Sequence, residues 1–353
     1  MKKPEAEIAK LIRPNILALK PYRCARDDYD SGILLDANEN SLGSNIGDED
    51  DLHRYPSPYQ EAFKEKFARF RSVNPNQIFT GNGSDEPIDL LIRIFCRPGN
   101  DAIITTPPTY GMYKVSAGVN DVENVEIPLT PDFQPQTDKI LEAADERTKI
   151  LFLCSPNNPT GNLLKQTDVV RLAEEFSGIV VIDEAYIDFA TTDSWASKLS
   201  HFDNLVVLQT LSKSFGLAGI RLGVALSSPY IIDMMNRVKA PYNINKLTSK
   251  AANEALEHID KMHESVEELL AQRKRLEREL AKRKYVKHIF PSDANFLLFR
   301  IENALKIYRE IADSGVVIRY RGDQIHCDDC LRVTVGTEDE NTAFLEHLDQ
   351  LNA

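Results

Sequence analysis

A lysine in a short hydroxyl-rich segment is the residue of this chain whose surroundings point most directly to chemistry. Lys213 is preceded by Thr210 and Ser212, and Arg221 follows after two glycines. Partial desolvation lowers the pKa of an ammonium group, and only the neutral amine is a nucleophile. The hydroxyls and the guanidinium suit a phosphate, because an arginine can bind two oxygens at once. An amine nucleophile beside phosphate donors describes a pyridoxal-phosphate site, in which a lysine holds the cofactor covalently.

Taken alone, this segment has a simpler explanation. A Ser-Lys-Ser sequence is more often a surface loop, since lysine is almost always solvated. A second candidate anion site lies at residues 81–86, Gly-Asn-Gly-Ser-Asp-Glu, between a predicted strand and a predicted helix. Its glycines allow close backbone approach, and the helix N-terminus offers free N–H groups to an anion. Ser84 is also a good N-cap residue, so plain capping explains this segment equally well.

A carboxylate ends the most apolar of the predicted strands. Asp183 follows the run Ile-Val-Val-Ile at 179–182, and an isolated buried charge is costly without a partner. A protonated pyridine nitrogen would be such a partner, and the pairing would keep the ring cationic and able to accept electrons. Tyr186 is near enough in sequence to reach a hydroxyl on the same ring. The alternative is an aspartate that caps a turn.

Further candidates follow other predicted strands. Tyr110 comes after a strand and a Pro-Pro-Thr segment, where it could stack on a flat ring or simply be a buried structural tyrosine. Asn157 lies in the rigid turn at 155–161, and its amide can donate to an oxygen anion. Arg319 and Arg332 lie on short apolar strands, which favours recognition of an anion over solvation. Structural ion pairs with acidic neighbours are the alternative.

The length, charge and cysteine spacing of the chain argue against several classes of function. The chain has 353 residues, of which 42% are apolar, and its net charge is −12. This length favours about two domains, and the negative charge argues against binding to nucleic acid or to anionic membranes. The first residues lack the apolar stretch of a secretory leader, and no apolar run is long enough to span a bilayer. Five scattered cysteines lack a disulfide-like spacing or a second Cys-x-x-Cys pair, so we expect a cytoplasmic protein without a metal site.

The elements that must position these residues alternate between strand and helix from about residue 76 to 226. Seven strands are predicted there, at 78–80, 103–105, 122–127, 150–154, 179–183, 205–208 and 222–226. This alternation predicts an α/β fold with a largely parallel sheet covered on both faces. Ligands of such sheets bind outside the carboxyl ends of the strands, where the motifs lie. A charged helical region at 230–285 precedes strands at 296–299, 316–319 and 331–335 and helices at 303–313 and 338–351, which predict a second, smaller α/β domain.

Taken together, these motifs give the chain a family resemblance. It resembles the fold-type-I, class II pyridoxal-phosphate-dependent aminotransferases, and within them most closely the histidinol-phosphate aminotransferases. The resemblance runs nearly end to end and rests on Arg-Pro-Asn-Ile and Lys-Pro-Tyr in the first 45 residues, Leu-Asp-Ala-Asn-Glu-Asn, Arg-Tyr-Pro, Gly-Asn-Gly-Ser-Asp-Glu, Asn-Asn-Pro-Thr-Gly, Asp-Glu-Ala-Tyr, the lysine segment and Leu-Arg-Val-Thr-Val-Gly. The segment between Arg319 and Arg332 matches the family only loosely.

The resemblance implies an architecture and a set of cofactor contacts. An N-terminal arm (1–45) would pack with the small domain (236–353), and a large domain (46–235), built on a mainly parallel seven-stranded sheet, would bind pyridoxal 5'-phosphate. Lys213 would be the catalytic residue and the covalent attachment point, with Asp183 on the ring nitrogen and Tyr110 stacked on the ring. The ring oxygen would contact Asn157 and Tyr186. The phosphate would be held by Ser84, the backbone N–H of Asp85, Thr210, Ser212, Arg221 and, from the neighbouring subunit of a homodimer, Tyr55.

The resemblance also implies a reaction. The enzyme would transfer the amino group of L-histidinol phosphate to 2-oxoglutarate in histidine biosynthesis. The phosphate ester of that substrate would be bound by Tyr22, Arg319 and Arg332, with Asn38 lining the same pocket. A threonine-phosphate decarboxylase and a general aromatic aminotransferase share the scaffold and remain alternatives. A regulator that only binds the cofactor is less well supported, because an acidic chain with a short arm lacks a DNA-binding segment.

Overall fold

A seven-stranded sheet forms the centre of the large domain, as predicted. The computed structural model describes residues 5–29, 31–47 and 50–352. The strand order is β1-β7-β6-β5-β4-β2-β3, and β7 alone runs antiparallel to its two neighbours. The strands are β1 (Ile78–Asn82), β2 (Ala102–Thr105), β3 (Glu123–Glu126), β4 (Thr148–Cys154), β5 (Ile179–Asp183), β6 (Leu205–Thr210) and β7 (Leu222–Ser227). Each of the seven strands predicted between 76 and 226 is therefore present, and the α/β fold class is confirmed.

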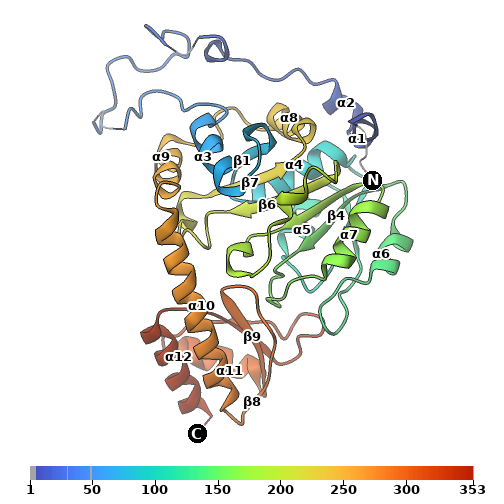
Figure 1. Ribbon diagram of the computed structural model, residues 1–353, viewed down its shortest axis with the longest axis vertical. Coiled ribbons are helices and arrows are strands. Elements are labelled where there is room, and N and C mark those ends of the chain that lie inside the picture. Colours follow the sequence, from blue (N-terminus) through green and yellow to red (C-terminus); the bar gives the residue numbers. More distant parts are fainter. Residues whose placement is uncertain (1–4, 30, 48–49, 353) are drawn as a thin grey trace.

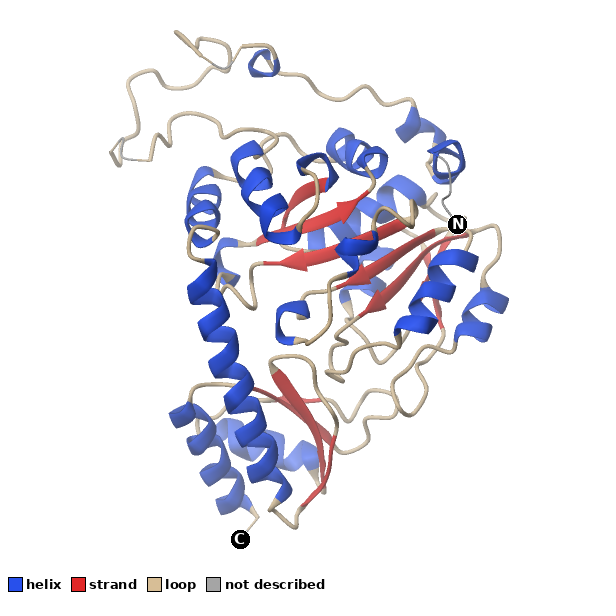
Figure 2. Ribbon diagram, in the orientation of Figure 1, coloured by secondary structure: helices blue, strands red, loops and turns tan. Residues whose placement is uncertain are grey.

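Alternate residues of the central strands enter two separate cores, one on each face of the sheet. In β5, Val180 and Ile182 lie in one core, whereas Ile179 and Val181 lie in the other. This is the two-residue period of a strand that is buried on both faces, and it explains why the run is continuously apolar. Both faces of the sheet are thus used for packing, and its parallel strands run in one direction, so that their carboxyl ends lie at the same edge (Figures 1 and 2).

Helices cover both faces of this sheet. Buried side chains of α3 (Glu61–Arg71), α6 (Thr137–Ala143), α7 (Gln166–Glu175) and α9 (Lys246–Ala255) enter the core on one face. Those of α1 (Glu5–Leu11), α4 (Asp85–Phe95), α5 (Met112–Val119) and α8 (Pro229–Val238) enter the core on the other. The phenylalanines at 63 and 67 are buried on α3, as their helical spacing predicts.

The small domain is a four-stranded antiparallel sheet packed against helices. Its strand order is β10-β11-β9-β8, with β8 (Val286–Ile289), β9 (Phe296–Ile301), β10 (Arg319–Tyr320) and β11 (Cys330–Thr334). The helices are α10 (Ile259–Ala281), α11 (Ala304–Asp313) and α12 (Glu338–Leu351). Strand β8 is not predicted by its sequence, and the strand expected at 316–319 is reduced to two residues. Figure 1 shows α10 running from the large domain into the small one.

The N-terminal arm differs from the expectation. Within this chain, α1 and α2 (Pro14–Leu17) pack on the large domain and not on the small one, because Ile8, Ile12 and Ile16 form an apolar stripe buried in the core around α4. The N–H of Arg13 also donates to the carbonyl of Ile94 at 3.0 Å. The chain then runs in an extended path over the large domain, with the short 3-10 helix η1 (Ala25–Asp27), before α3 begins (Figure 1).

The end of the large domain also differs from the boundary expected at residue 235. Ile244, Ala252 and Leu256 all belong to a core of the large sheet, so α9 packs with that domain. We therefore propose that the small domain begins with α10. In the described part of the chain, no helix combines the length and the apolar character that crossing a membrane requires.

Candidate active site

A cavity of about 630 Å³ lies where the carboxyl ends of the large-sheet strands face the small domain. Most of the side chains predicted for the site line it. From the large domain come Ser84, Asp85, Tyr110, Asp183, Tyr186, Thr210, Ser212, Lys213 and Arg221, and from the small domain come Arg319 and Arg332. The topology explains this convergence, since β1, β5 and β6 all end at the same edge of the sheet.

Lys213 lies near the centre of this constellation. Its Nζ is 5.7 Å from the centroid of the Tyr186 ring, and the side chain is half-buried. Burial lowers the pKa of the ammonium group, the charges of Arg332 and Arg221 lower it further, and the carboxylate of Asp183 opposes them. The site therefore increases the fraction of neutral amine, the form that a nucleophile or general base requires.

Asp183 is buried at the end of β5, and its carboxylate is held by neutral donors. The hydroxyl of Tyr113 donates to Oδ2 at 2.6 Å, and the N–H of Ala185 donates to Oδ1 at 3.0 Å. Burial raises the pKa of the carboxyl group, although these donors act in the opposite direction. A cationic ring nitrogen would suit this carboxylate, because it would supply the missing charge. Tyr113 is absent from the sequence prediction, which contains no local signal that connects it with Asp183.

A phosphate-sized group of donors lies at the start of α4. The hydroxyl of Thr210 is 2.9 Å from that of Ser212, and Arg221 lies within 3.6 Å of Asp85. Gly83 has a φ of +67°, and a Cβ there would lie 2.6 Å from Nη2 of Arg221, so only glycine leaves the guanidinium its place. Two hydroxyls, a guanidinium and a helix N-terminus are the donors that a phosphate binds. The described residues therefore fit pyridoxal phosphate at both its ring nitrogen and its phosphate.

Tyr110 is fixed at the same helix. Its hydroxyl donates to Asp85 Oδ1 at 3.0 Å, and its ring packs edge-on against Tyr113 with centroids 5.5 Å apart. These two contacts orient the Tyr110 ring toward the cavity that it lines. The geometry is compatible with stacking on a planar cofactor.

The turn at 155–161 requires a correction. Asn157 is 1% exposed and does not line the cavity. Its Nδ2 donates to the carbonyl of Pro108 at 2.8 Å and to the hydroxyl of Thr160 at 2.7 Å, so the amide is occupied in joining two loops. Asn158 lines the cavity instead, and its Oδ1 accepts a hydrogen bond from Arg332. The structure therefore places the side chain of Asn158, and not that of Asn157, in the cavity.

Three predicted residues lie outside this cavity. Tyr22 is 69% exposed on the arm, whereas Asn38 and Tyr55 line a separate cleft. Tyr55 stacks on Tyr242 with ring centroids 4.7 Å apart. Within one chain these residues do not meet Lys213, so any role in the same site requires a second copy of the chain.

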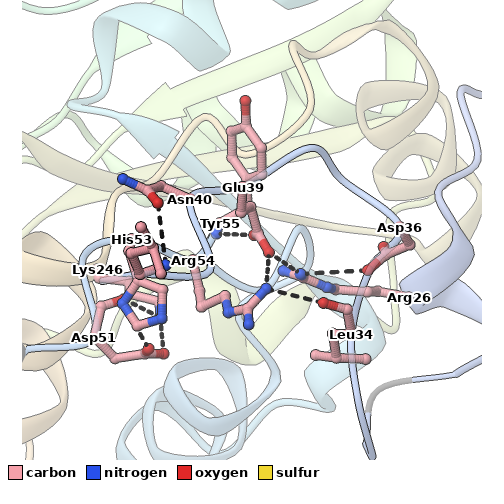
Figure 3. A network of polar contacts seen from close by, with 11 residues as sticks. Arg26, Leu34, Asp36, Glu39, Asn40, Asp51, His53, Arg54, Tyr55 and Lys246 are labelled. Atoms are coloured by element: carbon pink, nitrogen blue, oxygen red, sulfur yellow. Dashed lines mark hydrogen bonds and ion pairs between the residues drawn. The ribbon is translucent and has the colours of Figure 1, made fainter. Parts of the chain in front are cut away.

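Glu39 anchors the arm beside Tyr55 (Figure 3). Its carboxylate accepts hydrogen bonds from Arg26 at 2.5 Å, from Arg54 at 2.7 Å and from the backbone N–H of Tyr55 at 2.6 Å. The Arg26 hydrogen bond, with support from Arg54, lowers the pKa of Glu39 to about 2. The sequence shows Glu39 only as part of a motif and gives it no role, because its partners are distant along the chain.

The arginines of the small domain include one that the sequence analysis missed. Arg319 lies directly opposite Arg332 in the pairing of β10 with β11, and Arg321 lines the same cavity. The guanidinium of Arg332 packs over the ring of Phe296 at 5.1 Å. Burial lowers the pKa of Arg332 to about 10, and the charge of Arg321 is the next cause. No group of three or more metal-ligating side chains occurs among the described residues.

A family model, aminotransferase class I and II, matches residues 27–348. The chain belongs to this family. The histidinol-phosphate aminotransferase of Flavobacterium johnsoniae is 47% identical over 351 residues, which cover 98% of this chain and 99% of that protein.

Solved structures agree with this assignment. The histidinol-phosphate aminotransferase of Clostridium acetobutylicum has a TM-score of 0.78 and 28% identity, with 89% of this chain and 97% of that chain covered. The histidinol-phosphate aminotransferase of Sinorhizobium meliloti, solved with pyridoxal-5'-phosphate, has the same TM-score at 23% identity, with 89% and 90% covered. At that identity the second likeness concerns the fold alone.

Proposed function

We propose that this protein is a pyridoxal-phosphate-dependent histidinol-phosphate aminotransferase, which transfers the amino group of L-histidinol phosphate to 2-oxoglutarate. One observation carries the proposal furthest. A lysine with a lowered pKa and a buried carboxylate share one cavity with Arg319, Arg321 and Arg332, for which no carboxylate partner lies within ion-pair distance among the described residues. This cavity can hold the cofactor at one end and an anionic group of the substrate at the other. The nearly full-length similarity to histidinol-phosphate aminotransferases supports the same substrate.

The proposed roles follow from position in the cavity. Bound pyridoxal phosphate supplies an electron-accepting ring and an aldehyde that reacts with amines. Asp183 would hold a proton on the ring nitrogen, and Tyr186 and Asn158 would contact the ring oxygen. Lys213 Nζ would take the proton from the substrate α-carbon as a general base. Ser84, the N–H of Asp85, Thr210, Ser212 and Arg221 would hold the phosphate of the cofactor.

We further propose a symmetric homodimer in which each arm completes the partner's site. Ile33, Leu35 and Leu42 are 92%, 78% and 95% exposed along the arm. Apolar side chains gathered on one extended segment favour burial against another chain. In such a dimer Tyr55 would reach the cofactor phosphate of the partner, with Tyr22 and Asn38 near its substrate. None of the five cysteines forms a disulfide, which supports a location in the reducing cytoplasm.

Parallel assays of the holoenzyme test the substrate. L-Histidinol phosphate, L-threonine phosphate and L-phenylalanine are each offered with 2-oxoglutarate, while glutamate formation and CO₂ release are measured. We expect glutamate formation with histidinol phosphate at a higher kcat/KM than with phenylalanine, and no CO₂. Release of CO₂ from threonine phosphate would identify a decarboxylase, and a preference for phenylalanine would identify a general aromatic aminotransferase.

A mixed dimer tests the shared site. One subunit carries Lys213→Ala and the other carries Tyr55→Ala. If Tyr55 acts on the partner's cofactor, one of the two sites in each mixed dimer has both native residues, and activity returns to about half of the wild-type value. If Tyr55 acts within its own chain, neither site has both residues, and mixing restores nothing.

A further inference from the structure

Three guanidinium groups lie on one face of the small sheet, where the sequence analysis expected two. Arg319 and Arg332 are direct partners across β10 and β11, so their side chains lie on the same face. Arg321 follows Arg319 by two residues, and its N–H donates to the carbonyl of Cys330 at 2.9 Å, which extends the ladder beyond β10. Residues two apart in extended chain share a face. All three side chains accordingly line the active-site cavity.

This arrangement carries an electrostatic cost that no ion pair offsets among the described residues. None of the three arginines forms an ion pair with a carboxylate of residues 5–29, 31–47 or 50–352. The Nε atoms of Arg321 and Arg332 and the Oε1 atom of Gln324, which lines the same cavity, are buried without a hydrogen-bond partner. Burial and the charge of Arg319 both lower the pKa of Arg321, and the charge of Asp323 opposes them in part. Like charges that face each other across strands destabilise a sheet unless an anion lies between them.

The three arginines differ in what else they bind. Arg332 donates to Asn158 on the cofactor side of the cavity, so one of its guanidinium nitrogens already has a hydrogen-bond partner. Arg321 has no such partner in the described chain, and its side chain is half-buried rather than solvated. An arginine presents two parallel donors to the oxygens of one anion. Arg321 is therefore available to bind an oxygen that Arg319 and Arg332 leave free.

We propose that Arg321 is a substrate-binding residue that selects a phosphate monoester over an uncharged end group at the same position. A phosphate monoester has three terminal oxygens, one for each guanidinium, and its double negative charge matches the arginines better than a single carboxylate does. This inference rests on the proposed function for the choice of amine. The binding of the phosphate group itself does not depend on that choice.

The experiment compares two amines that differ only in the phosphate, L-histidinol phosphate and L-histidinol. Holoenzyme of the wild type, Arg321→Gln and Arg321→Lys is assayed with both. Because one charge-assisted contact is lost, Arg321→Gln should lower kcat/KM for the phosphorylated amine about 10- to 100-fold, chiefly through KM. The value for L-histidinol should change by less than about threefold, and Arg321→Lys should recover part of the loss because it keeps the charge. Arg309→Gln, an exposed arginine on α11 of the same domain, is the matched control.

A second measurement is independent of the amine. Inorganic phosphate is titrated into each holoenzyme by calorimetry, and Arg321→Gln should weaken its binding by a similar factor. Equal losses with both amines, or unchanged phosphate binding in Arg321→Gln, would overturn the role of Arg321. If the wild type instead fails to transfer the amine of histidinol phosphate while Arg321→Gln still weakens phosphate binding, the proposed substrate is wrong and the anion site stands.

Discussion

The hydroxyl of Tyr113 donates to Oδ2 of Asp183 at 2.6 Å, between two fully buried side chains. The tyrosine is in turn held by Phe152, whose ring stacks on it at 4.7 Å between centroids. Tyr113, held by Phe152, thus orients the carboxylate that is predicted to face the ring nitrogen of the cofactor. Because burial raises the pKa of Asp183 and this hydrogen bond lowers it, Tyr113 helps to keep the group ionised.

Tyr113→Phe should move the acidic limb of the activity profile to higher pH. The change removes the donor but keeps the ring, so the pKa of Asp183 rises and the carboxylate persists only at higher pH. Loss of one hydrogen bond of about 0.5–1.5 kcal/mol should lower kcat/KM by up to about tenfold near neutral pH. Profiles of kcat/KM against pH for both proteins check this, and an acidic limb that stays in place would remove Tyr113 from the mechanism.

Asp183→Asn should stabilise the protein without cofactor while it abolishes turnover. The pKa of Asp183 is raised in the folded state. Above the ordinary aspartate pKa, the unfolded chain therefore binds fewer protons than the folded chain does. The free energy of unfolding consequently falls as pH rises and the buried group ionises. The gain in melting temperature should therefore be a few degrees at pH 7.5 and small near pH 4. Calorimetry of both proteins at the two pH values measures it. Equal melting temperatures at pH 7.5 would mean that the buried charge is already compensated.

Lys213→Ala should remove both the covalent attachment and the general base. We expect the absorbance band of the lysine-bound cofactor to disappear and turnover to fall by about 10²–10⁴-fold or more. Absorbance spectra and single-turnover assays measure the two effects, and Lys213→Arg, which keeps the charge but is not a nucleophile, is the control. A variant that retained ordinary activity would show that another group is the base.

Substitution of Asn157 should chiefly lower the stability of the protein, whereas substitution of Asn158 should chiefly lower its activity. Asn157→Ala removes the hydrogen bonds to the carbonyl of Pro108 and to the hydroxyls of Thr109 and Thr160, which should cost about 1–3 kcal/mol of unfolding free energy. Asn158→Ala should leave stability nearly unchanged and reduce kcat/KM, because Asn158 lines the cavity and contacts Arg332. Chemical denaturation and steady-state kinetics measure both variants. The reverse pattern would restore the original expectation for position 157.

Glu39→Gln should loosen the arm. The neutral amide cannot pair with both Arg26 and Arg54, so protease cleavage within residues 18–59 should become faster. In the wild type, the pKa of Glu39 is lowered to about 2, so its stabilising contribution is complete above pH 4.5 and is lost only as pH falls through 2. Limited proteolysis at pH 7 compares the two proteins, with Glu7→Gln on α1 as the control. Equal cleavage rates would show that other contacts hold the arm.

The amino-acid sequence by itself determined the sheet and the chemistry at its edge. Short apolar runs such as 179–182, rich in β-branched residues and followed by turn residues, indicate strands buried on both faces, and the polar residue that ends a parallel strand lies at the carboxyl edge of the sheet. For this reason Asp183 and Lys213 could be placed in one site from local pattern alone. Motif resemblance then added the family, which the comparisons confirm, and implied the cofactor.

Only the tertiary structure decided which neighbours complete that site. Tyr113 meets Asp183 across 70 residues of sequence and leaves no local signal. The two-residue spacing of Arg319 and Arg321 is a local signal, but only the strand register brings them beside Arg332. In the turn at 155–161, adjacent asparagines point in opposite directions, so a one-residue difference separates a structural amide from one in the cavity. The arm packs on the large domain because Ile8, Ile12 and Ile16 are buried in the core around α4. That core exists only once the sheet and its helices have assembled.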